Sequence, residues 1–351
     1  MKKLSCSGMV IATLLALGGC NNADTAAETN AAPTSTQTIL RFSHLWPATG
    51  VLNQELFEPW AKKIEEDSDG RLKIEIYPSS SLSKPDNTYD ATVKGVVDIG
   101  AQVPGYVSGR FPLTEITQLP GLSTSSSQLN CILQTLYDDD VIASEYEDTH
   151  PLFMMAAGPG ILHTSDKLIE KPEDMVGMRI RGPSIIAINI IESAGGTPVG
   201  LPAPDQYNSL QRGVIDGVSF TWDGVGAFRL NELLDTHTDI PLYSPAIFVT
   251  MNKDKYESLP DDLKKVIDDN SGASMSRRAG EIFDSEDKKH KDEAIAKGDA
   301  LVTIPDPLND PRWKDLLTSE TEKYLKEASV TGIDAHNIYR KAQQASRSCK
   351  T

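Results

Sequence analysis

Residues 170–239 read EKPEDMVGMRIRGPSIIAINIIESAGGTPVGLPAPDQYNSLQRGVIDGVSFTWDGVGAFRLNELLDTHTD. Within this stretch MRIR (178–181) is predicted to be a short β-strand, which Gly182-Pro183 ends because proline has no N–H for a sheet hydrogen bond. Arg181 is therefore expected to be the last strand residue, at the edge of an open α/β sheet where ligands bind. A planar guanidinium fixed there is suited to hold a carboxylate through two parallel hydrogen bonds. The alternative for Arg181 is a salt bridge between lobes with one of the many acidic side chains.

The segments around that strand follow a recognisable order. PEDMVGMRIRGP (172–183) is followed, after a predicted helix, by GGTPVGLPAPDQYNSLQRGVIDGV (195–218). This order and spacing resemble the signature of the DctP-type periplasmic solute-binding proteins of TRAP transporters, and the resemblance extends from about Leu40 to about Trp313. The matching positions are Arg181 and Pro183, Ala194 to Pro198, Tyr207 to Gly213, and Asp216-Gly217.

The resemblance implies an α/β fold of the two-lobed periplasmic-binding-protein type. Each lobe would be a sheet flanked by helices, and a long helix would bridge both lobes. In the family, the arginine at the position of Arg181 holds the substrate carboxylate. The closed protein then docks, as an expected monomer, on the integral membrane subunits of a TRAP permease, which an ion gradient drives.

Two positions depart from relatives that bind dicarboxylates or sialic acid. Phe220 stands where such relatives often carry a polar residue, and Ile161 stands where some place a second arginine. These departures favour a monocarboxylate with an aromatic or aliphatic body. Phe220 ends the predicted strand VIDGVSF (214–220) and Trp222 follows it, so both are candidates to stack on that body. The alternative for both rings is an ordinary place in the core.

Three further candidate ligand residues come from the first part of the chain. His44 and Trp46 end the first predicted strand and are expected to face the same crevice. Tyr106 lies in the corresponding loop after the predicted strand VVDIGAQV (96–103). For each of these residues an ordinary structural role remains the alternative.

Enzymatic and metal-binding signatures are absent from the sequence. It contains no GxSxG, HExxH, CxxC or Walker motif, and its six histidines have no metal-ligand spacing. We therefore expect no enzymatic activity, no cofactor and no metal. Two other functions stay open, a hydrolase acting in the cleft and a subunit that presents a ligand to a membrane sensor.

The charge of the chain is strongly negative. Its 351 residues carry a formal charge of −16. Lys2 and Lys3 lie in an expected leader without acidic residues, so the mature chain would carry about two more negative charges. We expect no nucleic-acid binding, because that function needs a basic surface.

The first twenty residues, MKKLSCSGMVIATLLALGGC, have the pattern of a secretory leader. Their end, Leu17-Gly18-Gly19-Cys20, resembles a bacterial lipobox. We expect a signal peptide at 1–19, a lipid on Cys20, a disordered tether at 20–38 and a periplasmic, membrane-anchored protein. The alternative is an ordinary leader cut near this point.

Two cysteines would remain in the mature body. An export compartment permits a disulfide between Cys131 and Cys349. The alternative is a buried thiol at Cys131 and a loose thiol at Cys349, and the sequence does not decide between them.

From residue 39 the chain alternates predicted strands and helices, as in doubly wound α/β lobes. The strand AIFVTMN (246–252) is predicted to return to the first lobe, so that more than one strand crosses the hinge. A long charged helical stretch follows from Leu259, with its charges on a solvated face. The predicted bounds are 39–158 with 246–285 for lobe I, 159–245 with 286–330 for lobe II, and 331–351 for a C-terminal helix and tail.

Overall fold

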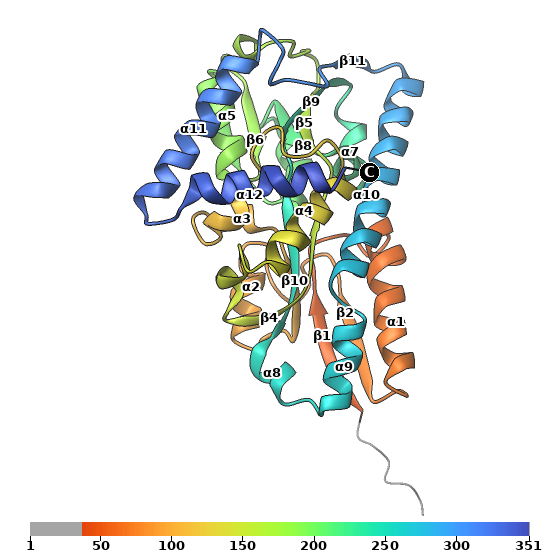
Figure 1. Cartoon of the computed structure of the whole chain (residues 1–351). Helices are drawn as coiled ribbons and strands as arrows, with labels where there is room; N and C mark the ends of the chain where they lie inside the picture. The colour runs from red at the N-terminus through yellow and green to blue at the C-terminus, as the bar shows by residue number, and fades with distance from the viewer. Residues whose placement is uncertain (1–36, 351) are drawn as a thin grey trace, which may run out of the picture. The chain divides into compact units, whose positions relative to one another are not determined.

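Residues 37–350 are described by a computed structural model, in which two β-sheets are flanked by helices (Figure 1). The predicted signal peptide, Cys20 and the tether up to residue 36 lie outside the described residues. The first strand begins at Thr38, so regular structure starts just inside the segment predicted as tether. Within residues 37–350, every helix is too short or too polar to traverse a lipid bilayer.

Lobe I is built on the first sheet, whose central strands are apolar. β10 is buried along its whole length, as expected for a strand covered on both faces. β1 pairs in parallel with β2 and β3, whereas β10 is antiparallel to β3 and β4. In spatial order the strands are β2 (Leu72–Tyr77), β1 (Thr38–Ser43), β3 (Ile99–Gln102), β10 (Ala246–Asn252) and β4 (Thr149–Ala156).

Lobe II is built on the second sheet. β6 lies between β7 and β8 and is parallel to both, while β5 is antiparallel to β8 and β9. In spatial order the strands are β11 (Ala300–Thr303), β9 (Thr236–Tyr243), β5 (Gly160–Thr164), β8 (Gly217–Phe220), β6 (Arg179–Gly182) and β7 (Thr197–Gly200).

Helices cover the faces of both sheets. In chain order they are η1 (Leu52–Phe57, π-helical), α1 (Glu58–Asp67), α2 (Thr88–Val93), α3 (Pro112–Ile116), α4 (Ser126–Asp138), α5 (Ile185–Ser193), α6 (Gln206–Gln211), α7 (Trp222–Ala227), α8 (Lys253–Glu257), α9 (Asp261–Asp269), α10 (Ala273–Lys297), α11 (Lys314–Val330) and α12 (Ala335–Ser348). Short 3-10 turns occur at Pro104–Tyr106, Ala143–Tyr146, Pro172–Met175, Ala203–Asp205 and Leu230–Glu232.

Several segments of the described chain connect the lobes. The chain passes from β4 to β5 through residues 157–159, and from β9 to β10 through Ser244 and Pro245. A third segment is α10, which contacts β4 and η1 in lobe I and α7 in lobe II (Figure 1). The predicted two-lobed fold with a long bracing helix is thereby confirmed.

The charged stretch after Leu259 forms two helices rather than one. α9 ends at Asp269 and α10 begins at Ala273, with Gly272 between them at φ +67°. Glycine adopts this left-handed region freely, whereas other residues are strained there. The Gly272 N–H donates to the Leu152 carbonyl (2.7 Å), which anchors the break on lobe I.

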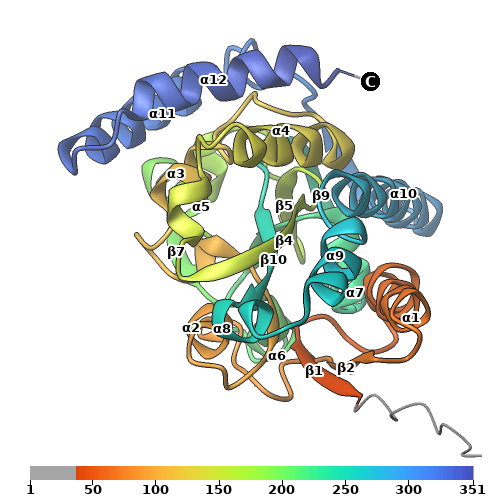
Figure 2. The same cartoon turned by 60° about the horizontal axis from the view of Figure 1, so that its bottom comes forward.

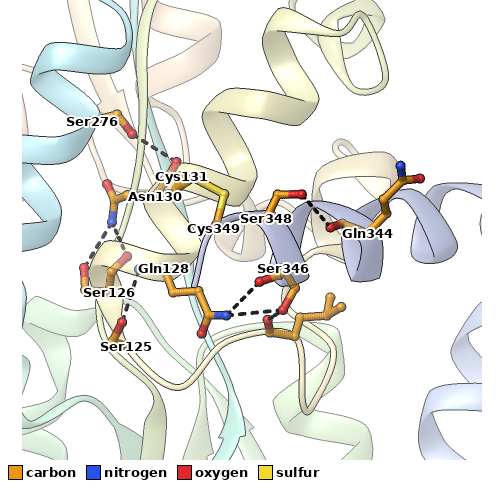
Figure 3. The surroundings of a disulfide bond; sticks show 11 residues. Ser125, Ser126, Gln128, Asn130, Cys131, Ser276, Gln344, Ser346, Ser348 and Cys349 are labelled. Atoms are coloured by element: carbon orange, nitrogen blue, oxygen red, sulfur yellow. Dashed lines mark hydrogen bonds between the residues drawn. A yellow bond between two sulfur atoms is a disulfide. The ribbon is translucent and has the colours of Figure 1, made fainter. Parts of the chain in front are cut away.

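The C-terminal helix α12 lies across α4 (Figure 2). A disulfide joins Cys131 of α4 to Cys349, directly after α12 (Figure 3). Their Cα atoms are 5.8 Å apart although the cysteines are 218 positions apart in sequence. Beside the bridge, Gln128 Nε2 donates to the Ser346 carbonyl (3.1 Å). Of the two alternatives left open by the sequence, the structure has the paired cysteines.

Replacing both cysteines, Cys131→Ser with Cys349→Ser, is expected to lower the free energy of unfolding. The bridge restricts the unfolded chain over 218 positions, and the chain-entropy value for a loop of that size, about 5 kcal/mol, is the upper end of the expected loss. Urea denaturation of both proteins measures the difference. Reductant should bring the wild type to the level of the double variant and leave the variant unchanged. Equal stability without reductant would contradict the prediction.

Candidate ligand-binding site

A largely apolar cavity lies between the two lobes. Lobe I contributes Trp46 and Tyr106 to its wall, lobe II contributes Phe220 and Tyr243, and α10 contributes Phe283. Its volume of about 40 Å³ is well below the roughly 150 Å³ of a cavity that holds benzene. A ring-sized ligand therefore enters only when the lobes separate or the aromatic side chains shift.

Arg181 lies beside this cavity, in the interior of the second sheet. β6 continues through Gly182, one residue further than predicted. The fully buried guanidinium donates from Nε to the Leu201 carbonyl (2.9 Å) and from Nη1 to the Ser219 carbonyl (3.1 Å). Its Cζ is 5.0 Å from the centroid of the Phe220 ring, within the range of a cation–π contact.

The buried charge of Arg181 has neutral partners. Among residues 37–350, no carboxylate oxygen lies within 4.0 Å of its nitrogens. The salt bridge between lobes, which was the alternative from the sequence, is therefore not formed. A buried cation without a counter-charge is costly, so this site stabilises an anion placed beside it.

Tyr106 joins the lobes at the same place. Its hydroxyl oxygen accepts the N–H of Ala203 (3.1 Å) and lies 3.4 Å from Arg181 Nη2. A Cβ added to Gly105 would come within 2.6 Å of Ser184 Cβ, so the two lobes are in close contact here. The cavity is closed, in part, by a lobe I hydroxyl that contacts the arginine of lobe II.

The structure brings four of the six candidate ligand residues together, namely Trp46, Tyr106 and Phe220 on the cavity wall and Arg181 beside it. His44 lies outside the cavity, contrary to the prediction. Its ring packs against Phe57, and Nε2 is 3.0 Å from Asn53 Oδ1. Burial lowers the pKa of His44 to about 4, so the neutral ring is a core residue at physiological pH.

Trp222 also lies outside the cavity, because the chain turns into a helix before it. β8 ends at Phe220, and Thr221 Oγ1 accepts a backbone N–H of α7 (3.3 Å) as the N-cap of that helix. Because β8 ends at Phe220, Trp222 does not follow the alternation of a strand and is not placed beside Phe220. The indole instead packs against His163 and His237, at ring-centroid distances of 4.8 and 4.7 Å.

Two acidic residues near the cavity were not predicted from the sequence. Asp223, on α7, lines it, and Asp287 of α10 accepts the Asp223 backbone N–H (2.7 Å). Asp284, one turn earlier, accepts two N–H groups at the start of α4 (2.7 and 3.0 Å). The prediction that every charge of this helix is solvated is therefore wrong. Spacing was the available signal, because Ala279 and Phe283 are buried and Asp287 continues their row at intervals of four.

Two α/β lobes that close over an aromatic cavity with a buried cation at its wall define a two-lobed solute-binding protein. The family described as bacterial extracellular solute-binding protein, family 7 (DctP), matches residues 42–327. The chain belongs to this family, the DctP type of TRAP solute-binding proteins, and the family predicted from the sequence is confirmed.

Similar proteins are known across nearly the whole chain. A TRAP solute-binding protein from an unidentified marine microbe, solved with 3-hydroxybenzoate, is 32% identical, with a TM-score of 0.83 over 90% of this chain and 100% of that one. A TRAP solute-binding protein from Rhodoferax ferrireducens, solved with copurified benzoate, is 29% identical, with a TM-score of 0.84 over 89% of this chain and 98% of that one. The outer membrane transporter protein TsaT of Comamonas testosteroni is 28% identical over 93% of this chain and 98% of its own length.

Tyr106→Phe is expected to shift the unliganded protein towards an open form. The change leaves the Ala203 N–H and Arg181 Nη2 without their shared acceptor in the closed form, at a cost of about 1–3 kcal/mol, whereas water satisfies both groups when the lobes part. Small-angle X-ray scattering should show a larger radius of gyration than for the wild type. Tyr77→Phe, which removes a hydroxyl bonded to Glu75 on lobe I, is the matched control. An unchanged radius in Tyr106→Phe would contradict the prediction.

Proposed function

We propose that this chain captures a small aromatic monocarboxylate between its lobes and delivers it to a separate TRAP membrane permease. The observation that carries this proposal is the fully buried guanidinium of Arg181, whose described hydrogen-bond partners are all neutral oxygens. A ligand carboxylate beside it would supply the counter-charge and accept charge-assisted hydrogen bonds. The surrounding cavity excludes water, which strengthens that ion pair.

The walls of the cavity favour an aromatic ligand body. Phe220, Trp46 and Tyr106 present rings to it, and little polar surface is exposed inside. Ile161, the position at which some relatives carry a second arginine, is buried opposite Phe220 in the β5–β8 pair. One cation among aromatic side chains suits one carboxylate on a ring. The two solved relatives described above bind 3-hydroxybenzoate and benzoate, which supports the same ligand class.

We propose hinge closure as the mechanism. The moving bodies would be the predicted lobes, 39–158 with 246–285 and 159–245 with 286–330. A ligand held by Arg181 and Phe220 of lobe II gains contacts with Trp46 and Tyr106 of lobe I only when the lobes close. This difference in contacts is the free energy that shifts the population to the closed form, which the permease would recognise.

Compartment, assembly and chemistry complete the proposal. The family is extracellular by its description, and the leader with its lipobox supports a periplasmic protein anchored through Cys20.

We propose that it acts as a monomeric binding protein and not as an enzyme. Incubation with a bound aromatic acid should return the acid unchanged, whereas turnover would favour the cleft hydrolase. Palmitate labelling that Cys20→Ala abolishes would support the anchor. A membrane sensor as the recipient of the closed form is the remaining alternative.

Substitution of Arg181 tests the carboxylate site. Arg181→Lys keeps the charge but loses the planar fork, and it is expected to weaken benzoate binding about 10- to 100-fold in calorimetry. Arg181→Gln should weaken binding further, because the charge is also lost. Arg179→Gln is the control, since Arg179 lies on the same strand but pairs with Asp216 at the surface. Undiminished affinity in both Arg181 variants would remove this residue from the anchor role.

The ligand class is tested by a thermal-shift series. Benzoate and mandelate should raise the melting temperature of the wild type more than succinate and malate, because a second carboxylate has no second arginine at Ile161. A larger shift with the two dicarboxylates would show that the cavity selects for polarity rather than for a ring.

A further inference from the structure

Asp223 is the acidic residue on the cavity wall. It is the second residue of α7, its side chain is 8% exposed, and its carboxyl Oδ1 has no hydrogen-bond partner among the described residues. Such an atom, buried and able to accept, is left unsatisfied at a cost unless another group donates to it.

Asp287 fixes the position and charge of Asp223. Its Oδ1 accepts the Asp223 N–H (2.7 Å), and its other oxygen leaves no room for a side chain at Gly158, where a Cβ would lie 1.7 Å away. Burial raises the pKa of Asp223, and it also raises the pKa of Asp287, where the neighbouring Asp223 charge adds to the effect. Ionisation of Asp287 is therefore less favourable while the neighbouring Asp223 carboxyl group is charged.

The Phe220 ring lies beside the arginine and beside this acidic wall. Arg181 Cζ lies 5.0 Å from the ring centroid. At the ring edge, a Cβ on Gly224, the neighbour of Asp223, would be 2.4 Å from a ring carbon. Arg181 and Gly224, the residue next to Asp223, thus both lie against the Phe220 ring.

Space for the far end of a ligand continues beyond Asp223. Trp46, Asp223 and Phe283 line both the cavity and a neighbouring open groove of about 310 Å³. A ligand with its carboxylate at Arg181 and its ring along Phe220 would therefore bring a substituent of the ring to Asp223.

We propose that Asp223 is the second polar contact of the ligand and selects aromatic acids that carry a hydroxyl group on the ring. The inference rests on the proposed function, because it needs the carboxylate at Arg181. Asp223 accepts the hydrogen bond of the ring hydroxyl, and Asp287 is a positioning residue that holds Asp223 in place through the Asp223 backbone N–H. An acid without the hydroxyl leaves the Asp223 acceptor unsatisfied and binds more weakly.

The test compares benzoate with 2-, 3- and 4-hydroxybenzoate by calorimetry. The wild type should bind one of the three isomers at least about tenfold more tightly than benzoate. Asp223→Ala should remove this preference, so that benzoate and the three hydroxybenzoates bind with affinities within about threefold of one another. If Asp223→Ala does not fold, Asp223→Asn should still reduce the preference, since a neutral amide oxygen is a weaker acceptor than a carboxylate.

Asp287→Asn tests the positioning role. The amide oxygen can still accept the Asp223 N–H, so the hydroxyl preference should be kept. Asp287→Ala should reduce the preference ratio. Asp292→Asn, on the exposed face of the same helix, is the control. It should change neither the benzoate affinity nor the preference for the hydroxybenzoate.

The outcomes separate the two proposals. Benzoate binding with no preferred hydroxybenzoate isomer, or a preference that survives Asp223→Ala, overturns the role of Asp223 and leaves the proposed function intact. Failure of the wild type to bind any of the four acids overturns both.

Discussion

The burial of one positive charge is the constraint on which the site depends. Arg181 comes from β6, the second strand from one edge of the lobe II sheet, and its guanidinium is held by the carbonyls of Leu201, just after β7, and Ser219, in β8. Tyr243 donates to the same Ser219 carbonyl (3.1 Å). Neutral dipoles from the two neighbouring strands thus orient the cation before any ligand arrives, and they leave its charge uncompensated. Because the guanidinium is already oriented, less entropy is lost when a ligand binds. Because the guanidinium lacks a counter-charge, an anionic ligand gains binding free energy that a neutral ligand does not.

Closure of the lobes is coupled to that charge through Tyr106. Its hydroxyl is a lobe I group that contacts Arg181. Tyr106 follows Gly105, where the two lobes are in close contact. Because several segments cross between the lobes, the relative motion available to the lobes is a bend rather than free rotation. α10 spans both lobes and contacts α4, which the disulfide fastens to the C-terminal helix. In the proposed closure, the hinge would work against this frame, and ligand contacts would decide its position.

The sequence predicted the architecture well because the fold follows from local patterns. The short strand before Gly182-Pro183 and the order of segments after it were enough to place Arg181 beside the cavity. The side chains beyond the strand ends were harder to predict, because their direction depends on caps and packing. The Thr221 cap turns the chain before Trp222, and the Asn53 amide together with Phe57 retains His44 in the core. Asp287 was missed for a different reason, since charge composition suggests a solvated face and only the row of buried residues on α10 shows that one carboxyl faces inward.

The small volume of the cavity bears on how a ligand is selected. The wall formed by Trp46, Asp223 and Phe283 divides a cavity of about 40 Å³ from a groove of about 310 Å³. Phe283 is buried on α10 and Asp223 is held by Asp287, whereas Trp46 lies in the loop after β1. Trp46 is thus the lobe I member of this wall, and its displacement would join the two spaces into one large enough for a substituted ring. In the proposed binding mode, length along the Arg181–Asp223 direction is set by these two groups of lobe II, with Asp223 held by Asp287 of α10, while lobe I supplies the cover.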